Sequence, residues 1–338
     1  MSKTEHTGGR VLLALGVLLA ALFILSFCLG RYGVDAGTTC RILLSRLLPL
    51  EQTWTGNEYT AVLNIRLPRI VLACLVGCCL SSAGAAYQGV FQNPMASPDV
   101  LGASSGASFG AALAILVGVG NQGTRLSASS TLLPSAALFR SVRPGARVLR
   151  ALSLVLAGMV ISSLFTAATS YLKLVADPTS QLPEITYWLM GSLSGTRLAD
   201  VARIAPAMAA GLFPLFLLRW KLNLLTLGDD EARAMGVNAP RLRFLTVVCA
   251  TLVTAASIAV SGMIGWVGLV VPHLCRKLVG SNFRVLLPCS MLAGAAFLLL
   301  VDNLSRNLLA TEIPIGILTA FTGAPFFLYL MLRKGGAR

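Results

Sequence analysis

The uncharged run from Ile70 to Phe91 constrains this chain more than any other feature of its sequence. At about 1.5 Å of rise per residue, a helix of this length crosses a hydrocarbon core of about 30 Å. Arg66 and Arg69 precede the run, and the proline-containing segment Asn93–Asp99 ends it with residues that favour turns. The run is rich in Gly, Ala and Ser, which let membrane helices approach closely. We therefore expect a spanning helix that packs against other helices on several sides.

The composition of the whole chain indicates a polytopic membrane protein. Of its 338 residues, 56% are hydrophobic and 12% are charged, and the mean hydropathy is +0.78. The first apolar run is longer than that of a signal peptide, and we expect it to be retained as a helix. We predict an all-α polytopic membrane protein, a single transmembrane domain over 1–338 with about ten helices. The candidate spans are 11–30, 70–91, 100–120, 128–140, 148–172, 200–218, 244–261, 263–279, 285–304 and 313–332.

The formal net charge of +14 is best explained by membrane topology. With ten spans, both termini and most of the Lys and Arg residues fall on the same side. The positive-inside rule makes this side cytoplasmic, so we predict a multi-pass protein of the inner (cytoplasmic) membrane with both termini in the cytoplasm. No basic stripe interleaved with aromatic residues is present, which argues against nucleic acid as a partner and leaves membrane lipid.

The sequence carries no pattern typical of covalent chemistry. It has no G-x-x-x-x-G-K-[ST] phosphate-binding loop, and its only histidines are His6 and His273. Cys74 and Cys78 lie four residues apart on one helical face, but cysteine in an apolar helix behaves as a small apolar residue. No cluster has the spacing of metal ligands or of a catalytic triad. We therefore predict that the chain is not an enzyme and binds no metal or cofactor of its own.

The longest polar insertion on the basic side is Lys221–Arg243. Its acidic stretch Asp229–Glu231 complements the dipole at the start of a short helix, and Gly236 can cap the end of that helix. On this pattern alone, the insertion is either a solvated loop or a docking element for a soluble partner.

Few ionisable residues lie within the apolar runs. Asp302 is the best candidate for a group that could couple transport to an ion, and it lies towards a helix end with Arg306 and Glu312 nearby. An ion-coupled secondary transporter needs such intramembrane groups, so their scarcity counts against that class without removing it as the alternative.

Four stretches in the same order resemble the FecCD family, the permeases of binding-protein-dependent ABC importers for iron-siderophores, haem and vitamin B12. They are RLPR from Arg66, QNPMASPDVLGASSGA from Gln92, GWVGLVVPHLCR from Gly265 and EIPIGILTAFTGAPFF from Glu312. The resemblance covers about 60–333, and 121–147 depart from it. It implies a vitamin B12 importer-like permease fold, whose function is to move an iron-siderophore, haem or cobalamin-type chelate into the cytoplasm.

The resemblance also implies partners. They are a second copy of the chain in a homodimer, two cytoplasmic ATP-binding subunits that hold ATP and Mg, and a periplasmic or lipid-anchored substrate-binding protein. The pathway between the copies would be lined by small and apolar groups from 152–175 and 313–327, which does not say which chelate is carried.

The resemblance assigns three groups of site residues. The coupling loop at about 221–243, which sits in a groove of the ATPase, contains Asp229, Asp230, Glu231, Ala232, Arg233 and Gly236. The loop at the cytoplasmic mouth contains Asn93, Pro94 and Met95. The periplasmic surface would present Arg66, Arg69 and Arg306, each suited to a bidentate pair with a glutamate of the binding protein.

Overall fold

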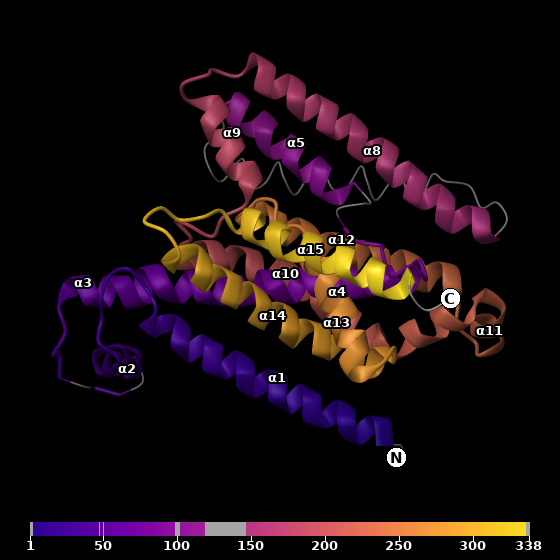
Figure 1. The fold of residues 1–338 in the computed structure, drawn as a ribbon, viewed down its shortest axis with the longest axis horizontal. Coiled ribbons are helices and arrows are strands. Elements are labelled where there is room, and N and C mark those ends of the chain that lie inside the picture. Colours follow the sequence, from indigo (N-terminus) through magenta and orange to yellow (C-terminus); the bar gives the residue numbers. More distant parts are fainter. Residues whose placement is uncertain (1–2, 47, 50, 99–101, 119–146, 336–338) are drawn as a thin grey trace.

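A computed structural model of the protein describes residues 3–46, 48–49, 51–98, 102–118 and 147–335. Over these ranges the chain is helical, with turns between the helices and no strand (Figure 1). The helices in chain order are α1 (Lys3–Cys28), α2 (Ala36–Leu44), α3 (Gly56–Tyr59), the π-helical segment η1 (Thr60–Arg66), α4 (Leu67–Val90), α5 (Ala103–Leu116), α8 (Arg147–Val175), α9 (Gln181–Met190), α10 (Leu198–Leu227), α11 (Asp229–Ala234), α12 (Ala239–Ser261), α13 (Val267–Val279), α14 (Phe283–Asn307) and α15 (Ile315–Gly335).

The all-α polytopic architecture predicted from the sequence is confirmed. Six helices of the described chain are long and apolar enough to cross a membrane, and α5 and α15 contain shorter apolar stretches. Every predicted span except one coincides with a helix of the structure. The exception, 128–140, lies outside the described residues, so the total of ten stays a prediction.

Helix α4 lies at the centre of the bundle, as its small residues predict. It packs against α10, α12, α13 and α14, and most of its side chains are buried. The contacts are as close as backbones allow: a Cβ atom on Gly84 would lie 1.8 Å from the carbonyl oxygen of Gly268 in α13. A Cβ atom on Gly77 would lie 2.2 Å from the carbonyl oxygen of Gly294 in α14. Glycine at these positions therefore sets the spacing between α4 and its neighbours.

Helices α5, α8 and α9 form a separate layer along one side of the bundle (Figure 1). Helix α5 packs against α8 on one side and α12 on the other, and α9 contacts α5 and α15. Helix α8 leaves large apolar side chains exposed, among them Leu156, Val160, Leu164 and Leu174. Such a surface is typical of a helix that faces lipid or another apolar helix.

The bundle has two distinct ends (Figure 1). Both marked chain ends lie at the same end as α11, and we call this the terminal end. Helices α2 and α3, the start of α4 and the connection between α14 and α15 lie at the opposite end, which we call the α3 end. The two chain ends therefore lie at one end of the bundle, as the predicted topology requires.

The structure shows how the polar insertion at about 221–243 is built. The first residues of the insertion belong to α10, which continues to Leu227, and its last residues belong to α12, which begins at Ala239. Helix α11 and two short turns lie between them. The last turns of α10 are held by Asn223, whose side-chain amide donates to Asn282 Oδ1 at 3.0 Å and whose Oδ1 accepts from the Phe283 backbone N–H at 2.8 Å. These hydrogen bonds satisfy the polar side chain of Asn223 inside the protein, so α10 can continue past the end of its apolar run.

Candidate functional site

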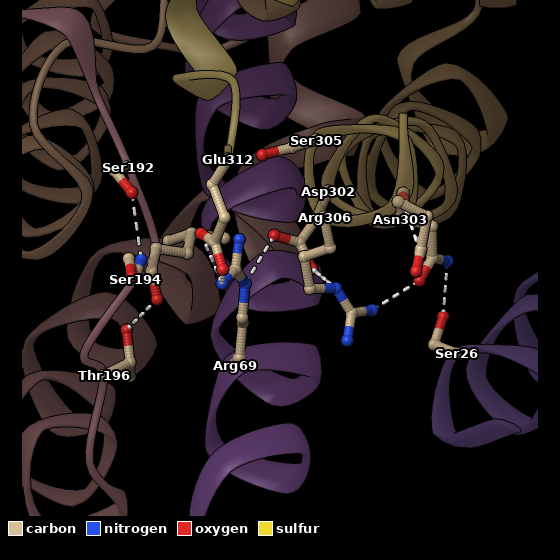
Figure 2. A network of polar contacts seen from close by, with 12 residues as sticks. Ser26, Arg69, Ser192, Ser194, Thr196, Asp302, Asn303, Ser305, Arg306 and Glu312 are labelled. Carbon is tan, nitrogen blue, oxygen red and sulfur yellow. Dashed lines mark hydrogen bonds and ion pairs between the residues drawn. The ribbon is translucent and has the colours of Figure 1, made fainter. Parts of the chain in front are cut away.

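Four charged side chains meet at the α3 end of the bundle (Figure 2). Arg69, in the first turn of α4, donates from Nε to Asp302 Oδ1 on α14 at 2.8 Å. Its Nη1 donates to both carboxylate oxygens of Glu312, at 3.0 and 2.9 Å. Arg306, one turn after Asp302 on α14, places Nε 3.1 Å from Asp302 Oδ2. We call Arg69, Asp302, Arg306 and Glu312 the arginine–carboxylate cluster.

Three of the four members of the cluster are almost completely removed from solvent. Asp302 is 0% exposed, and Arg69 and Arg306 are 5% and 7% exposed. The Glu312 side chain is the most accessible member, at 35%. Two guanidinium groups and two carboxylates cancel in charge, which is the condition under which buried ions are tolerated. Two buried donors of the cluster, Arg69 Nη2 and Arg306 Nε, make no hydrogen bond among the described residues, although Arg306 Nε is ion-paired with Asp302.

Glu312 is positioned by the connection between α14 and α15. The backbone N–H of Ile313 donates to the Ser305 carbonyl at 3.2 Å, and Ser305 Oγ donates to the Ile313 carbonyl at 2.6 Å. These two bonds fold the connection back on α14. Glu312, the residue before Ile313, is thereby brought to Arg69.

Arg66 lies beside the cluster and ties α4 to the end of α1. Its guanidinium donates to the backbone carbonyls of Phe27 and Tyr32. On the other side, Arg306 Nη2 donates to Asn303 Oδ1, and Asn303 Nδ2 donates to Ser26 Oγ in α1 at 2.6 Å. The polar groups at this end therefore join α1, α4 and α14.

The three predicted docking arginines do not project from the surface. Arg66 is 4% exposed, and Arg69 and Arg306 are the buried members of the cluster. The expectation of surface arginines is wrong for this structure because Asp302, Glu312 and two backbone carbonyls satisfy their charges internally. The spacing of Asp302 and Arg306, four residues apart on one helix, is the sequence signal that could have predicted the pairing. The docking role itself stays a prediction.

A cavity of about 650 Å³ opens next to the cluster. Its wall is formed by one face of α9, the segment after α9, the end of α12 and the connection before α15. The lining residues are Glu184, Tyr187, Trp188, Ser192, Ser194, Ala259, Val260, Ser261, Gly262, Glu312 and Pro314. We call this the α9 cavity. Glu312 belongs both to its wall and to the arginine–carboxylate cluster.

The sequence did not predict α9, because its apolar stretch is too short to span a membrane. Its entry is fixed by Asp177, whose Oδ1 accepts from the hydroxyls and backbone N–H groups of Thr179 and Ser180 at 2.6 to 2.9 Å. These bonds lower the pKa of Asp177 to about 2. At its other end α9 stops at Gly191, whose φ of 71° and close approach to the Met263 carbonyl exclude a side chain. The helix is thereby held at the cavity wall.

A second cavity, of about 610 Å³, is lined by the end of α9, the segment between α12 and α13, and α15. It is apolar where the α9 cavity is polar, with a lining that includes Leu189, Met190, Trp266, Ile317 and Phe321. Its α15 residues fall within 313–327, one of the two segments expected to line a pathway. Residues of 152–175 do not line this cavity in the described chain.

The predicted mouth residues lie directly after α4. The Asn93 side chain accepts from the Met95 backbone N–H at 2.9 Å, which forms the turn expected of an Asn-Pro sequence. Pro94 is exposed and Met95 is 42% exposed. Their role at the mouth of a pathway needs a second copy of the chain and stays a prediction.

The predicted short helix in the polar insertion is present as α11. It ends in a Schellman motif: Gly236 N–H donates to the Arg233 carbonyl and Val237 N–H donates to the Ala232 carbonyl, both at 2.9 Å. Gly236 has the expected positive φ, 76°. Ala232 is buried against the bundle, whereas Glu231 and Arg233 are exposed. The side chains of Asp229 and Asp230 lie outside the described part. The insertion thus presents a small capped helix at the terminal end.

Several apolar spans packed around a central helix define the described chain as a polytopic membrane protein. No group of three or more potential metal ligands occurs in the described part of the chain. The chain belongs to the FecCD transport family, whose model matches residues 18–333. It is therefore an ABC transporter permease, of a family whose permease subunits carry no ATPase site of their own.

Individual relatives extend over nearly the whole chain. The molybdate import system permease protein MolB of Haemophilus influenzae is 39% identical over 97% of both chains. The hemin transport system permease protein HmuU of Yersinia pestis is 38% identical over 95% of this chain and 96% of its own. A solved ABC transporter assigned to the metal-chelate type, in an inward-facing conformation, matches with a TM-score of 0.85 and 37% identity, over 96% of this chain and 99% of that one.

Proposed function

We propose that this chain is the membrane-spanning subunit of a binding-protein-dependent importer that moves a metal chelate into the cytoplasm. ATP hydrolysed by two partner subunits would drive the transport, and two copies of the chain would form the pathway. The observation that supports this most strongly is the match to a metal-chelate-type transporter along almost the entire chain, at 37% identity. In this proposal the terminal end faces the cytoplasm and the α3 end faces the binding protein.

The alternative, an ion-coupled secondary transporter, is disfavoured by the surroundings of Asp302. A coupling carboxylate must gain and lose a proton or cation during the cycle. Asp302 is instead fixed by Arg69 at 2.8 Å and Arg306 at 3.1 Å, both buried. Releasing its negative charge would leave two buried cations with one remaining carboxylate, which opposes such a cycle.

Uptake into proteoliposomes tests the proposed function. The permease is reconstituted with its ATPase and binding protein, with ATP enclosed and a gallium chelate offered outside. We expect uptake that requires ATP and the binding protein, and none with a proton gradient alone. Uptake driven by the proton gradient without ATP would establish the alternative instead.

In the same system, we propose that α11 and its cap transmit ATP hydrolysis to the pathway. We predict that Gly236→Pro abolishes ATP hydrolysis stimulated by the loaded binding protein. Proline cannot adopt the φ of 76° and lacks the N–H that bonds to Arg233, so the Schellman motif is lost. Gly236→Ala keeps that N–H and has open space for its methyl group, at a cost of about 1–2 kcal/mol for the backbone, and should retain part of the stimulation.

Deletion of the six residues Asp229–Ala234 should have the same effect as Gly236→Pro. Size-exclusion chromatography of the complex must show that the permease remains assembled, since α11 contributes little to the core. Normal stimulated turnover in an assembled Gly236→Pro or deletion variant would remove α11 from the coupling role.

We also propose that the binding protein engages the α3 end through the cluster, with a carboxylate of the partner replacing Glu312 on Arg69. Glu312 is the exposed member of the pair, so the exchange begins with its release from Arg69, whose buried Nη2 makes no hydrogen bond among the described residues. We predict that Glu312→Gln raises the affinity of the permease for its binding protein several-fold, because a neutral amide competes less well for guanidinium. Glu231→Gln, at an exposed position of α11 at the opposite, terminal end, serves as the control for binding-protein affinity.

Surface plasmon resonance at low ionic strength measures this effect, because exposed ion pairs are screened by salt. Unchanged or weaker binding of the Glu312→Gln variant, with its fold intact, would contradict an exchange of carboxylates on Arg69.

A further inference from the structure

The charged residues that line the α9 cavity indicate which ligands it favours, a property that membership of the family does not specify. Two carboxylates line it, Glu184 and Glu312, and none of its described lining residues is basic. Arg69 contacts Glu312 from behind the wall, so it offsets part of that charge without offering its own guanidinium to the cavity. Glu184 is exposed and forms no ion pair with a described residue. The described lining of the cavity therefore carries a net negative charge, most of it on Glu184.

Aromatic and hydroxyl groups accompany these carboxylates. Glu184, Tyr187 and Trp188 lie three and four residues apart, so they share one face of α9. Tyr187 is 70% exposed and has no core-packing role that would explain its position. Aromatic faces beside carboxylates attract cations and stack on flat conjugated groups. Ser192, Ser194 and Ser261 add hydroxyl groups on the opposite parts of the wall.

The size of the cavity also restricts its ligand. Its volume of about 650 Å³ lies within the range of roughly 300–1,000 Å³ that is typical of sites for drug-sized molecules. A tetrahedral oxyanion would fill only a small part of this space, and it would meet two carboxylates and no cation. An organic chelate of neutral or positive charge meets neither problem.

We infer that the α9 cavity is a substrate-receiving site selective for neutral or cationic organic metal chelates, and that it excludes oxyanions and anionic chelates. Glu184 sets the charge preference, and Tyr187 and Trp188 provide the contact surface. This inference rests on the proposed import function, because it assigns the substrate class of that pathway. It separates this chain from a carrier of a small oxyanion, although a molybdate permease is among its relatives.

Equilibrium dialysis of the full-length permease in lipid nanodiscs tests the inference. The probes are the cationic gallium complex of desferrioxamine B, the neutral gallium complex of desferrichrome, anionic gallium citrate and molybdate. Gallium and molybdenum are counted by mass spectrometry. We expect the cationic and neutral complexes to bind at least about tenfold more tightly than the two anions, a difference of about 1.4 kcal/mol or more.

Two variants assign the preference to this cavity. Glu184→Gln keeps the size of the side chain and removes its charge, and it should lower the preference for the cationic over the neutral complex several-fold. Tyr187→Leu should weaken binding of the cationic complex, because the aromatic face is lost. Glu51→Gln, a matched change of an exposed carboxylate outside the cavity, should leave all four affinities unchanged.

Tighter binding of molybdate or gallium citrate would overturn the inference, as would a preference that Glu184→Gln leaves intact. These results are distinguishable from a failure of the proposed function. Anion binding combined with ATP-dependent uptake overturns only the substrate class, whereas uptake driven by a proton gradient overturns the importer whatever the charge of its substrate.

Discussion

Asp302→Asn is expected to lower the free energy of unfolding by about 3–5 kcal/mol, which is enough to remove much of the folded protein. The substitution preserves the shape of the side chain but removes the anion that lies between Arg69 and Arg306. Both guanidinium groups are buried, so neither can turn to water for compensation. Only Glu312 then remains to balance two buried cations.

The measurement is the thermal unfolding of the purified permease in detergent, together with the yield of monodisperse protein. The control is Glu312→Gln, which removes a carboxylate of the same cluster that is 35% exposed and should cost clearly less. The paired variant Asp302→Leu with Arg306→Leu removes both charges, leaves Arg69 with Glu312, and should recover part of the loss. An Asp302→Asn protein as stable as the parent would show that the cluster does not hold the α3 end together.

Gly84→Val is expected to prevent α4 from docking in the bundle. A Cβ atom at this position would lie 1.8 Å from the Gly268 carbonyl oxygen and 2.5 Å from its carbonyl carbon. Both atoms are backbone of α13, so no rotamer change can relieve the overlap. The helices would have to separate, and overpacking of a core commonly costs 1–3 kcal/mol even where side chains can adjust. The expected result is aggregated protein and a strong loss of membrane-inserted, monodisperse permease.

Gly16→Val provides the matched control, because a Cβ atom on Gly16 in α1 has no neighbour within 4 Å. It introduces the same side chain into an apolar helix and should be recovered at close to the parent yield. Fluorescence-detected size-exclusion chromatography of both variants measures the difference. A Gly84→Val protein that elutes and melts like the Gly16→Val protein would refute the contact between the two backbones.

The placement of the described long helices could be predicted because hydrocarbon demands long apolar runs, whereas their total of about ten stays a prediction. The centrality of α4 could also be predicted, because glycine and serine in an uncharged run permit close packing that lipid does not otherwise reward. Residues 128–140 lie outside the described chain, so this part of the prediction stays open.

The short helices were the weakest part of the prediction. Helix α9 is too short for a span, and its sequence does not reveal that it lines a cavity. The predicted span 200–218 also stops short of the end of α10 at Leu227, where Asn223 bonds to Asn282 across the bundle. By contrast, α11 was predicted correctly, because a capping glycine and an acidic first turn are local signals.

The partners of the three arginines Arg66, Arg69 and Arg306 could not be predicted from the sequence. Positive charge is disfavoured away from the predicted cytoplasmic side, so these arginines were expected to have an anionic partner. The sequence does not distinguish a partner on another protein from one within the chain. Asp302 lies more than two hundred residues from Arg69 along the chain, so only the packing of α4 on α14 brings them together.

Glu312 belongs to both the arginine–carboxylate cluster and the α9 cavity, so binding events at these two sites affect each other. Two sites that use one carboxylate are thermodynamically linked. A cationic ligand that draws Glu312 into the cavity weakens its hold on Arg69, and any carboxylate that captures Arg69 frees Glu312 for the ligand. By reciprocity, the two events change each other's equilibrium constant by the same factor. Under the two proposals, a single side chain would couple binding of the transported chelate to binding of the partner's carboxylate.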